Sequence, residues 1–130
     1  MNPPPQLQAK NLVPVVIKLK DSYKLWQVLL AILPKTLRYS MGIKIDSLFV
    51  EVIEYTSMAS FLEKSEKLPY LKVAIRKIDT IKILLMIVWE NRGIDDKKYI
   101  TISESLNEVG KMLGGWSGQL IKSASVKTSA

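Results

Sequence analysis

The stretch PVVIKLKDSYKLWQVLLAIL, residues 14–33, decides the fold. Its apolar residues recur three and four positions apart, which is the spacing of one face of a helix. That face contains Val15, Leu19, Tyr23, Trp26, Leu29, Leu30 and Leu33. Pro14 suits a first helical turn, and Pro34 disfavours helix at the residue before it. We therefore predict an amphipathic helix over residues 14–33.

Three further stretches repeat this helical spacing, at residues 35–59, at residues 67–91, and from a start between Tyr99 and Ser103 to residue 123. Gly93 is the expected left-handed cap after the third stretch. Four helices with short connections predict an all-α, antiparallel up-down-up-down four-helix bundle over residues 12–123. Residues 1–11, with three consecutive prolines, and residues 124–130, which are small and polar, are expected to be a flexible N-terminal tail and a disordered C-terminal tail.

The composition of the 130 residues argues against an enzyme, because the chain contains no cysteine and no histidine. Disulfides, thiol nucleophiles, zinc sites of the Cys or His type and the usual base near neutral pH are thereby excluded. Carboxylate catalysis stays as a remote alternative, with isolated acids such as Glu51 and Glu54. We expect no catalytic residue, metal or cofactor. The sequence contains no membrane-spanning run or signal peptide and predicts a soluble cytoplasmic protein.

The net charge of +7 favours a polyanionic partner, of which nucleic acid is the commonest. Residues 10–44 carry seven basic residues and one acid, and residues 67–92 carry six basic residues and two acids. In an up-down bundle the first and third helices are diagonal, so these groups cannot form one patch on a single copy. The expected binding is electrostatic and salt-dependent. The candidate nucleic-acid-binding residues are Lys35, Arg38, Lys44, Lys72, Arg76 and Lys82.

The second half of the third predicted helix is apolar all round. Ile83, Met86 and Ile87 lie near the side opposite its main apolar face. A helix that is apolar all round must be buried all round, which favours contact with another copy of the chain. The alternative is that these are scattered surface apolar residues, which are common.

The segment GKMLGGWSG, residues 110–118, contains four of the six glycines. Phosphate-binding loops require a preceding strand, and what precedes this segment is helical. Gly110 and Gly114 share a helix face and predict a small-residue groove, within the bundle or between subunits, with Trp116 as a bulky anchor on a different face. The candidate packing and oligomer residues are Ile83, Ile87, Gly110, Gly114 and Trp116.

Two motifs carry a resemblance to a known family. LPKTLRYSMGIKI, residues 33–45, resembles the F-P-K/R…R-[FY]-[ST]-[LM]-G segment of the accessory variability determinant proteins of diversity-generating retroelements. EVGKMLGGW, residues 108–116, resembles that family's E-I-G-R-M-L-G-G-W. Between them, LKVAIRKI resembles its third helix, with Arg76 at the matching arginine, although Lys72 and Ile75 depart from its usual arginine and leucine.

The resemblance implies a four-helix bundle that assembles as a barrel-like or ring-like homopentamer with a basic surface. It also implies a non-catalytic protein that binds RNA or DNA and a reverse transcriptase, and that supports mutagenic synthesis of complementary DNA. A sister family with the same fold is encoded in intervening sequences of bacterial ribosomal RNA genes. Members of that family usually carry an N-I-A-E-G-like segment where this chain reads EVIEYTSMASF, residues 51–61. A structural or RNA-binding bundle of that type is the alternative.

Overall fold

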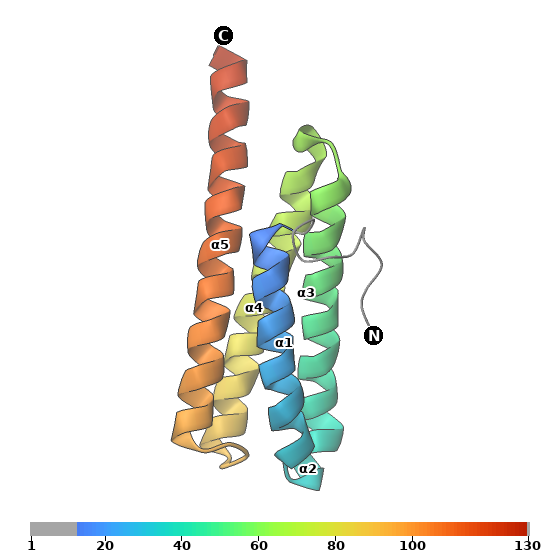
Figure 1. Ribbon diagram of the computed structural model, residues 1–130, viewed down its shortest axis with the longest axis vertical. Coiled ribbons are helices and arrows are strands. Elements are labelled where there is room, and N and C mark those ends of the chain that lie inside the picture. The colour runs from blue at the N-terminus through green and yellow to red at the C-terminus, as the bar shows by residue number, and fades with distance from the viewer. Residues whose placement is uncertain (1–12, 130) are drawn as a thin grey trace.

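The computed structural model describes residues 13–129, with the backbone alone for residues 126–129, and all regular elements in this range are helices (Figure 1). The long helices are α1 Pro14–Ile32, α3 Ile43–Phe61, α4 Lys67–Glu90 and α5 Asp96–Ser129. The short elements are α2 Lys35–Leu37, the π-helical turn η3 Arg38–Gly42 and the 3-10 turn η4 Lys64–Glu66. The N-terminal tail predicted for residues 1–11 lies outside the described residues.

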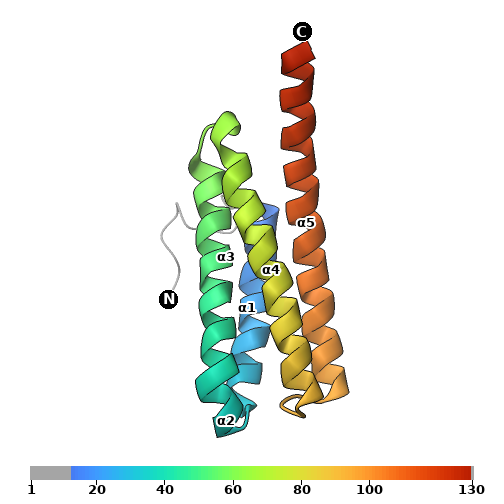
Figure 2. The same cartoon turned by 180° about the vertical axis from the view of Figure 1, so that it is seen from behind.

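The long helices pack as the predicted four-helix bundle. Around the bundle, α1 contacts α3 and α5, and α4 contacts the same two helices. The first and third long helices, α1 and α4, are therefore diagonal, as the sequence predicted. The two views in Figures 1 and 2 show successive long helices running in alternating directions. Among the described residues, no helix is both long enough and apolar enough to cross a membrane.

The core is formed by the apolar faces that the sequence spacing predicted. Its largest fully buried side chains include Leu19, Trp26, Phe49, Ile78 and Leu106, one or two from each long helix. The Trp26 ring stacks on the Phe49 ring with centroids 6.0 Å apart and planes inclined by 15°. Aromatic pairs of this kind add stability beyond the area they bury.

The predicted helix 35–59 is divided by the π-helical turn η3, and its last helix, α3, extends to Phe61. Gly42 closes the turn in a buried position, where a Cβ atom would lie 2.8 Å from Leu30 Cδ1. The chain thus folds back onto the last turns of α1 so closely that a side chain at position 42 would force Leu30 to shift. π-Helical turns inside α-helices are rare, and the periodicity of the sequence does not indicate one.

The cap predicted at Gly93 is wrong, because Arg92 is the residue with a positive φ, of 62°. The N–H of Arg92 donates to the Trp89 carbonyl at 2.9 Å, and the N–H of Gly93 donates to the Val88 carbonyl at 2.8 Å. This is a Schellman motif with Arg92 in the left-handed position and Gly93 one residue beyond. Gly93 is needed for space instead: a Cβ there would lie 2.7 Å from Leu37 Cδ1.

Helix α5 is longer at both ends than predicted. It begins at Asp96, before the interval Tyr99 to Ser103, because the Asp95 carboxylate accepts the Lys98 N–H at 2.8 Å and caps the first turn. It continues to Ser129, where a disordered tail over residues 124–130 was expected. The sequence after Gly118 contains no glycine or proline that would end a helix. Figures 1 and 2 show the C-terminal end of α5 standing beyond the turn between α3 and α4.

One polar contact ties α1 to α3 beside the core. Asp46 Oδ1 accepts the indole N–H of Trp26 at 3.1 Å and the hydroxyl of Tyr23 at 2.9 Å. Trp26 is fully buried, so its N–H has no access to water. Partial burial, and then the hydrogen bond to Asp46, raise the pKa of Tyr23 above its usual value. We infer that Asp46 fixes the register of α1 on α3, because the Trp26 donor needs this acceptor.

We expect Asp46→Ala to lower the free energy of unfolding by about 1–3 kcal/mol, the cost of leaving a buried donor without a partner. Urea denaturation followed by circular dichroism measures the change. Asp46→Asn is the matched control, because its side-chain oxygen still accepts the Trp26 hydrogen bond, and we expect it to cost less. Equal losses for the two variants would contradict this role for the Asp46 acceptor.

Candidate nucleic-acid interface

The six predicted nucleic-acid-binding residues do not form one surface. Lys35 and Lys44 are exposed on α2 and the first turn of α3, at one end of the bundle. Lys72 and Arg76 are exposed one turn apart on α4, in its N-terminal half. The two pairs are therefore separate surfaces on a single copy, as the diagonal arrangement predicted.

Arg38 has a structural contact that the sequence did not indicate. Its Nη2 atom donates to the Ala31 carbonyl at 3.0 Å and to the Leu33 carbonyl at 2.9 Å. These carbonyls lie at the C-terminal end of α1, where a cation is favoured by the helix dipole. The Arg38 side chain is half-buried, and its Nε atom is buried without a hydrogen-bond partner. Its guanidinium thus joins the end of α1 to the turn η3, and less of it is left for a phosphate.

Lys82 is also turned toward the protein. It is half-buried, and its ammonium lies 3.4 Å from the point where a Cβ atom of Gly110 would stand. Gly110 of α5 therefore lies beside the Lys82 ammonium of α4, at a distance that a Cβ atom would also tolerate. The contact places Gly110 at the junction of α4 and α5, and Lys82 is half-buried there, unlike the exposed Lys72 and Arg76.

The structure brings further cations to the end of the bundle that carries Lys35 and Lys44. Leu37 of α2 packs against Gly93, so the turn between α4 and α5 lies beside α2, and Figures 1 and 2 show both at the same end. The exposed cations gathered there, which we call the basic end, are Lys35, Lys44, Arg92, Lys97 and Lys98. The last three are not among the candidates predicted from the sequence. Lys97 and Lys98 follow two acids in a segment whose charge is near balance, and Arg92 was counted only as part of the basic stretch 67–92.

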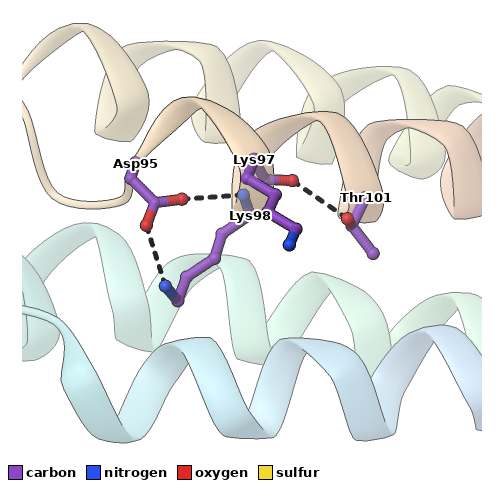
Figure 3. Close-up of polar contacts among 4 residues, drawn as sticks. All are labelled: Asp95, Lys97, Lys98 and Thr101. Atoms are coloured by element: carbon purple, nitrogen blue, oxygen red, sulfur yellow. Dashed lines mark hydrogen bonds and ion pairs between the residues drawn. The ribbon is translucent and has the colours of Figure 1, made fainter.

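Two of the carboxylates at the basic end are engaged by neighbouring groups. Asp95 accepts the Lys98 backbone N–H and its ammonium, both at 2.8 Å, as Figure 3 shows. Hydrogen bonding to Lys98 lowers the pKa of Asp95 below its ordinary value of 3.8. Asp96 accepts the indole N–H of Trp89 at 2.8 Å, and the Trp89 ring stacks on Tyr99 with centroids 4.7 Å apart. Five cations and three acids, the third being Glu90, leave this end with a positive balance of two.

Comparisons of the chain with known protein families, with curated proteins and with solved structures found no match.

What the described residues can contribute to a function is charged groups on a shaped surface. No group of three or more Asp or Glu side chains among them is placed to hold a metal ion. Glu51, a candidate acid, pairs with the Lys77 ammonium at 2.9 Å, and Glu54 is exposed on α3. The basic end can place several cations against phosphate groups, which positions a nucleic acid without reading its sequence.

The predicted packing residues fall into two groups. Ile83 and Ile87 are 55% and 37% exposed, so the outer side of α4 is apolar and uncovered on a single copy. Trp116 packs against the edge of the core, with the Lys67 ammonium 5.7 Å from its ring centroid. Gly114 makes no contact with another helix of the bundle, so that form of the prediction is wrong: beyond its own stretch of helix backbone, no heavy atom lies within 4 Å of its Cβ position. Gly115 and Gly118 are equally open.

The Asp95 cap gives a pH-dependent prediction. Its pKa is lowered in the folded protein, so its charge stabilises the fold above the ordinary pKa of 3.8, and this contribution is lost as the pH falls through the lowered value. We expect Asp95→Asn to melt at a lower temperature than the wild type at pH 7, and the gap to close in acid. Asp95→Ala, which also removes the capping oxygen, melts lower still. Thermal melts over a pH series measure both, and a gap for Asp95→Asn that does not change with pH would contradict the ion pair.

Proposed function

We propose that this protein is a non-catalytic, nucleic-acid-binding subunit of a homo-oligomer that acts as an accessory to the reverse transcriptase of a diversity-generating retroelement. The observation that carries the proposal is the basic end, which gathers five exposed cations from α2, α3, the α4–α5 turn and the first turn of α5. The net charge of +7 and the two motifs around residues 33–45 and 108–116 support it.

The partner chemistry follows from how the basic groups are presented. Lys35, Lys44 and Lys97 are exposed and make no ion pair among the described residues. Free lysines release counterions from a phosphate backbone, so binding falls steeply with salt. Lys72 and Arg76 on α4 supply a second contact, and an oligomer joins such patches into one surface. The proposed ligand is therefore RNA, DNA or their hybrid, bound through its backbone.

We expect the double variant Lys35→Gln, Lys44→Gln to weaken binding about equally for all sequences. It should also reduce the salt slope by roughly 0.7–0.9 for each phosphate that is no longer neutralised. The variant Lys72→Gln, Arg76→Gln does the same for the second patch. Fluorescence anisotropy with structured RNA, duplex DNA and an RNA–DNA hybrid over a salt series measures both.

The charge-matched control for these variants is Lys20→Gln, Lys64→Gln, which removes two exposed lysines that lie outside both patches. We expect it to leave the salt slope unchanged. Wild-type binding that is absent at low salt, or that does not respond to salt, would contradict the proposed function. An equal effect of the control would show that net charge alone, and neither patch, is responsible.

The assembly part of the proposal depends on the uncovered side of α4 and α5. Ile83, Met86 and Ile87 expose apolar surface on α4, and Gly114 and Gly118 leave the α5 backbone bare. Glycine in a helix interior costs about 1 kcal/mol relative to alanine, and nothing within the chain offsets this cost at Gly114. Close approach of another copy supplies the missing reason. The copy number of five comes from the resemblance.

We expect Gly114→Leu to reduce the assembled mass while the subunit stays folded, because the chain leaves room for the side chain and leucine favours helix. Gly115→Leu is the control, since its side chain points roughly 100° away around the helix. Light scattering after size-exclusion chromatography and circular dichroism measure mass and fold. An unchanged mass with a higher melting temperature would mean that no subunit approaches Gly114.

The ribosomal intervening-sequence type is the second candidate function, because it shares the four-helix bundle. The two candidates differ in their protein partner. Co-purification with a reverse transcriptase encoded beside the gene, together with an imperfect repeat pair nearby, would decide for the retroelement. Binding to ribosomal RNA segments without any such enzyme would decide for the alternative.

A further inference from the structure

A continuous groove follows the junction of α1 and α5, on a different side of α5 from Gly114. Three recesses of about 610, 350 and 390 Å³ succeed one another along it. Lys97 and Lys98 line both the first and the second recess, and Leu25 and Thr101 line both the second and the third. We call this surface the α1–α5 groove. Figure 3 shows Lys97, Lys98 and Thr101 on α5 with other helices passing beneath them.

The middle of the α1–α5 groove is apolar. Val28 and Leu25 of α1 are 64% and 38% exposed there, and buried Leu29 and Ile102 form the floor. The three exposed apolar residues of this face are Leu25, Val28 and Ile32, which follow one another at helical spacing. A set of exposed apolar residues on one helix face marks a surface that another protein covers.

The two ends of the groove carry opposite charge. At the end near the α4–α5 turn, three cations face two carboxylates: Arg92, Lys97 and Lys98 against Asp95 and Asp96. At the far end, three carboxylates face two cations: Asp21, Glu104 and Glu108 against Lys18 and Lys24. The ion pairs Lys98–Asp95 at 2.8 Å and Lys18–Glu108 at 2.6 Å hold part of each set. Lys97 and Glu104 make no ion pair among the described residues, so each is available to a partner.

This order of charges identifies the partner. A half turn about an axis through Val28 exchanges the two ends of the groove. The positively charged end of one groove then meets the negatively charged end of a second groove. The apolar centres then meet each other. Such a surface is complementary to itself, which is the requirement of a two-fold interface. A uniformly acidic partner, nucleic acid included, would be repelled by the carboxylates at the far end.

We propose that the α1–α5 groove is a two-fold interface that pairs two copies of this chain, with Val28 at its centre and Lys97 opposite Glu104 of the second copy. This pairing goes beyond the proposed function and does not depend on it. It engages Arg92, Lys97 and Lys98 of the basic end, so in the paired species the phosphate contacts at that end fall to Lys35 and Lys44. It uses the face between α1 and α5, whereas the proposed assembly uses the outer side of α4 and the glycines of α5. If both contacts form, the groove joins two rings; if the groove acts alone, it makes a dimer.

The first test places a charge at the apolar centre. We expect Val28→Asp to halve the mass of the wild-type protein in sedimentation equilibrium, from a dimer to a monomer or from paired rings to single rings. Phe61→Asp is the matched control, because Phe61 is an exposed apolar residue on α3, outside the groove. We expect this control to leave the mass unchanged. Circular dichroism verifies that both variants are folded.

The second test exchanges charges across the interface. Lys97→Glu places carboxylates opposite Glu104 twice in the paired species, and Glu104→Lys places ammonium groups opposite Lys97 twice. We expect each variant alone to weaken pairing about tenfold, since the interface carries the altered contact on both sides of its axis. Mixed in equal amounts, the two variants form complementary contacts at both positions, and we expect pairing to return to at least the wild-type strength.

The outcomes separate this inference from the others. Pairing that survives Val28→Asp, or a mixture of charge variants that does not recover, would overturn the two-fold groove. So would a wild-type protein that is monomeric at micromolar concentration, or whose only assembly is an odd-numbered ring unaffected by these variants. Salt-dependent binding of RNA that persists in folded Val28→Asp would show that the nucleic-acid function stands whether or not the groove pairs.

Discussion

The arrangement of the bundle depends on one buried donor, the indole N–H of Trp26. Apolar contacts have no direction, whereas a buried N–H without a partner costs free energy at every other register. Asp46 Oδ1 supplies the acceptor and takes the Tyr23 hydroxyl as well. Because these hydrogen bonds fix the position of α1 along α3, the chain between the two helices must turn within a few residues. Gly42 and the Arg38 contacts to the end of α1 are the local means of that turn.

The sequence predicted the helices well and their ends poorly. Apolar spacing is repeated many times along each helix, so a single odd residue does not hide it, and α1 and α4 begin and end within a residue of the predicted bounds. An end depends on one or two atoms. Arg92 holds the left-handed position, although the glycine preferred there is its neighbour, because Gly93 is needed where Leu37 presses against the turn. That requirement comes from α2, which is far away in the sequence.

The candidate surface was only partly predictable for the same reason. The charge pattern along the chain indicated Lys35 and Lys44, but not Lys97, because its acidic neighbours Asp95 and Asp96 leave that segment near balance. Arg92 belonged to the basic stretch 67–92, and only the structure places it beside Lys35 and Lys44. The structure shows which charges are used internally: Asp95 binds Lys98, and Arg38 binds carbonyls of α1. For the glycines the sequence pattern predicted a shared surface that the structure does not contain. The spacing of Gly110 and Gly114 indicated one groove, whereas the first lies beside the Lys82 ammonium and the second faces open space.

The placement of the tryptophans has a practical consequence for spectroscopy. Trp26 lies in the sealed core beside a carboxylate, Trp89 is stacked on Tyr99 next to the α4–α5 turn, and Trp116 lies under the Lys67 ammonium. The three indoles thus experience a dry, an aromatic and a cationic environment, in three separate regions of the chain. Indole emission responds to each of these surroundings. The protein therefore carries its own optical labels: loosening of the core, changes at the turn and changes along α5 each alter the intrinsic fluorescence, and replacing two of the three tryptophans by phenylalanine isolates the response of the third.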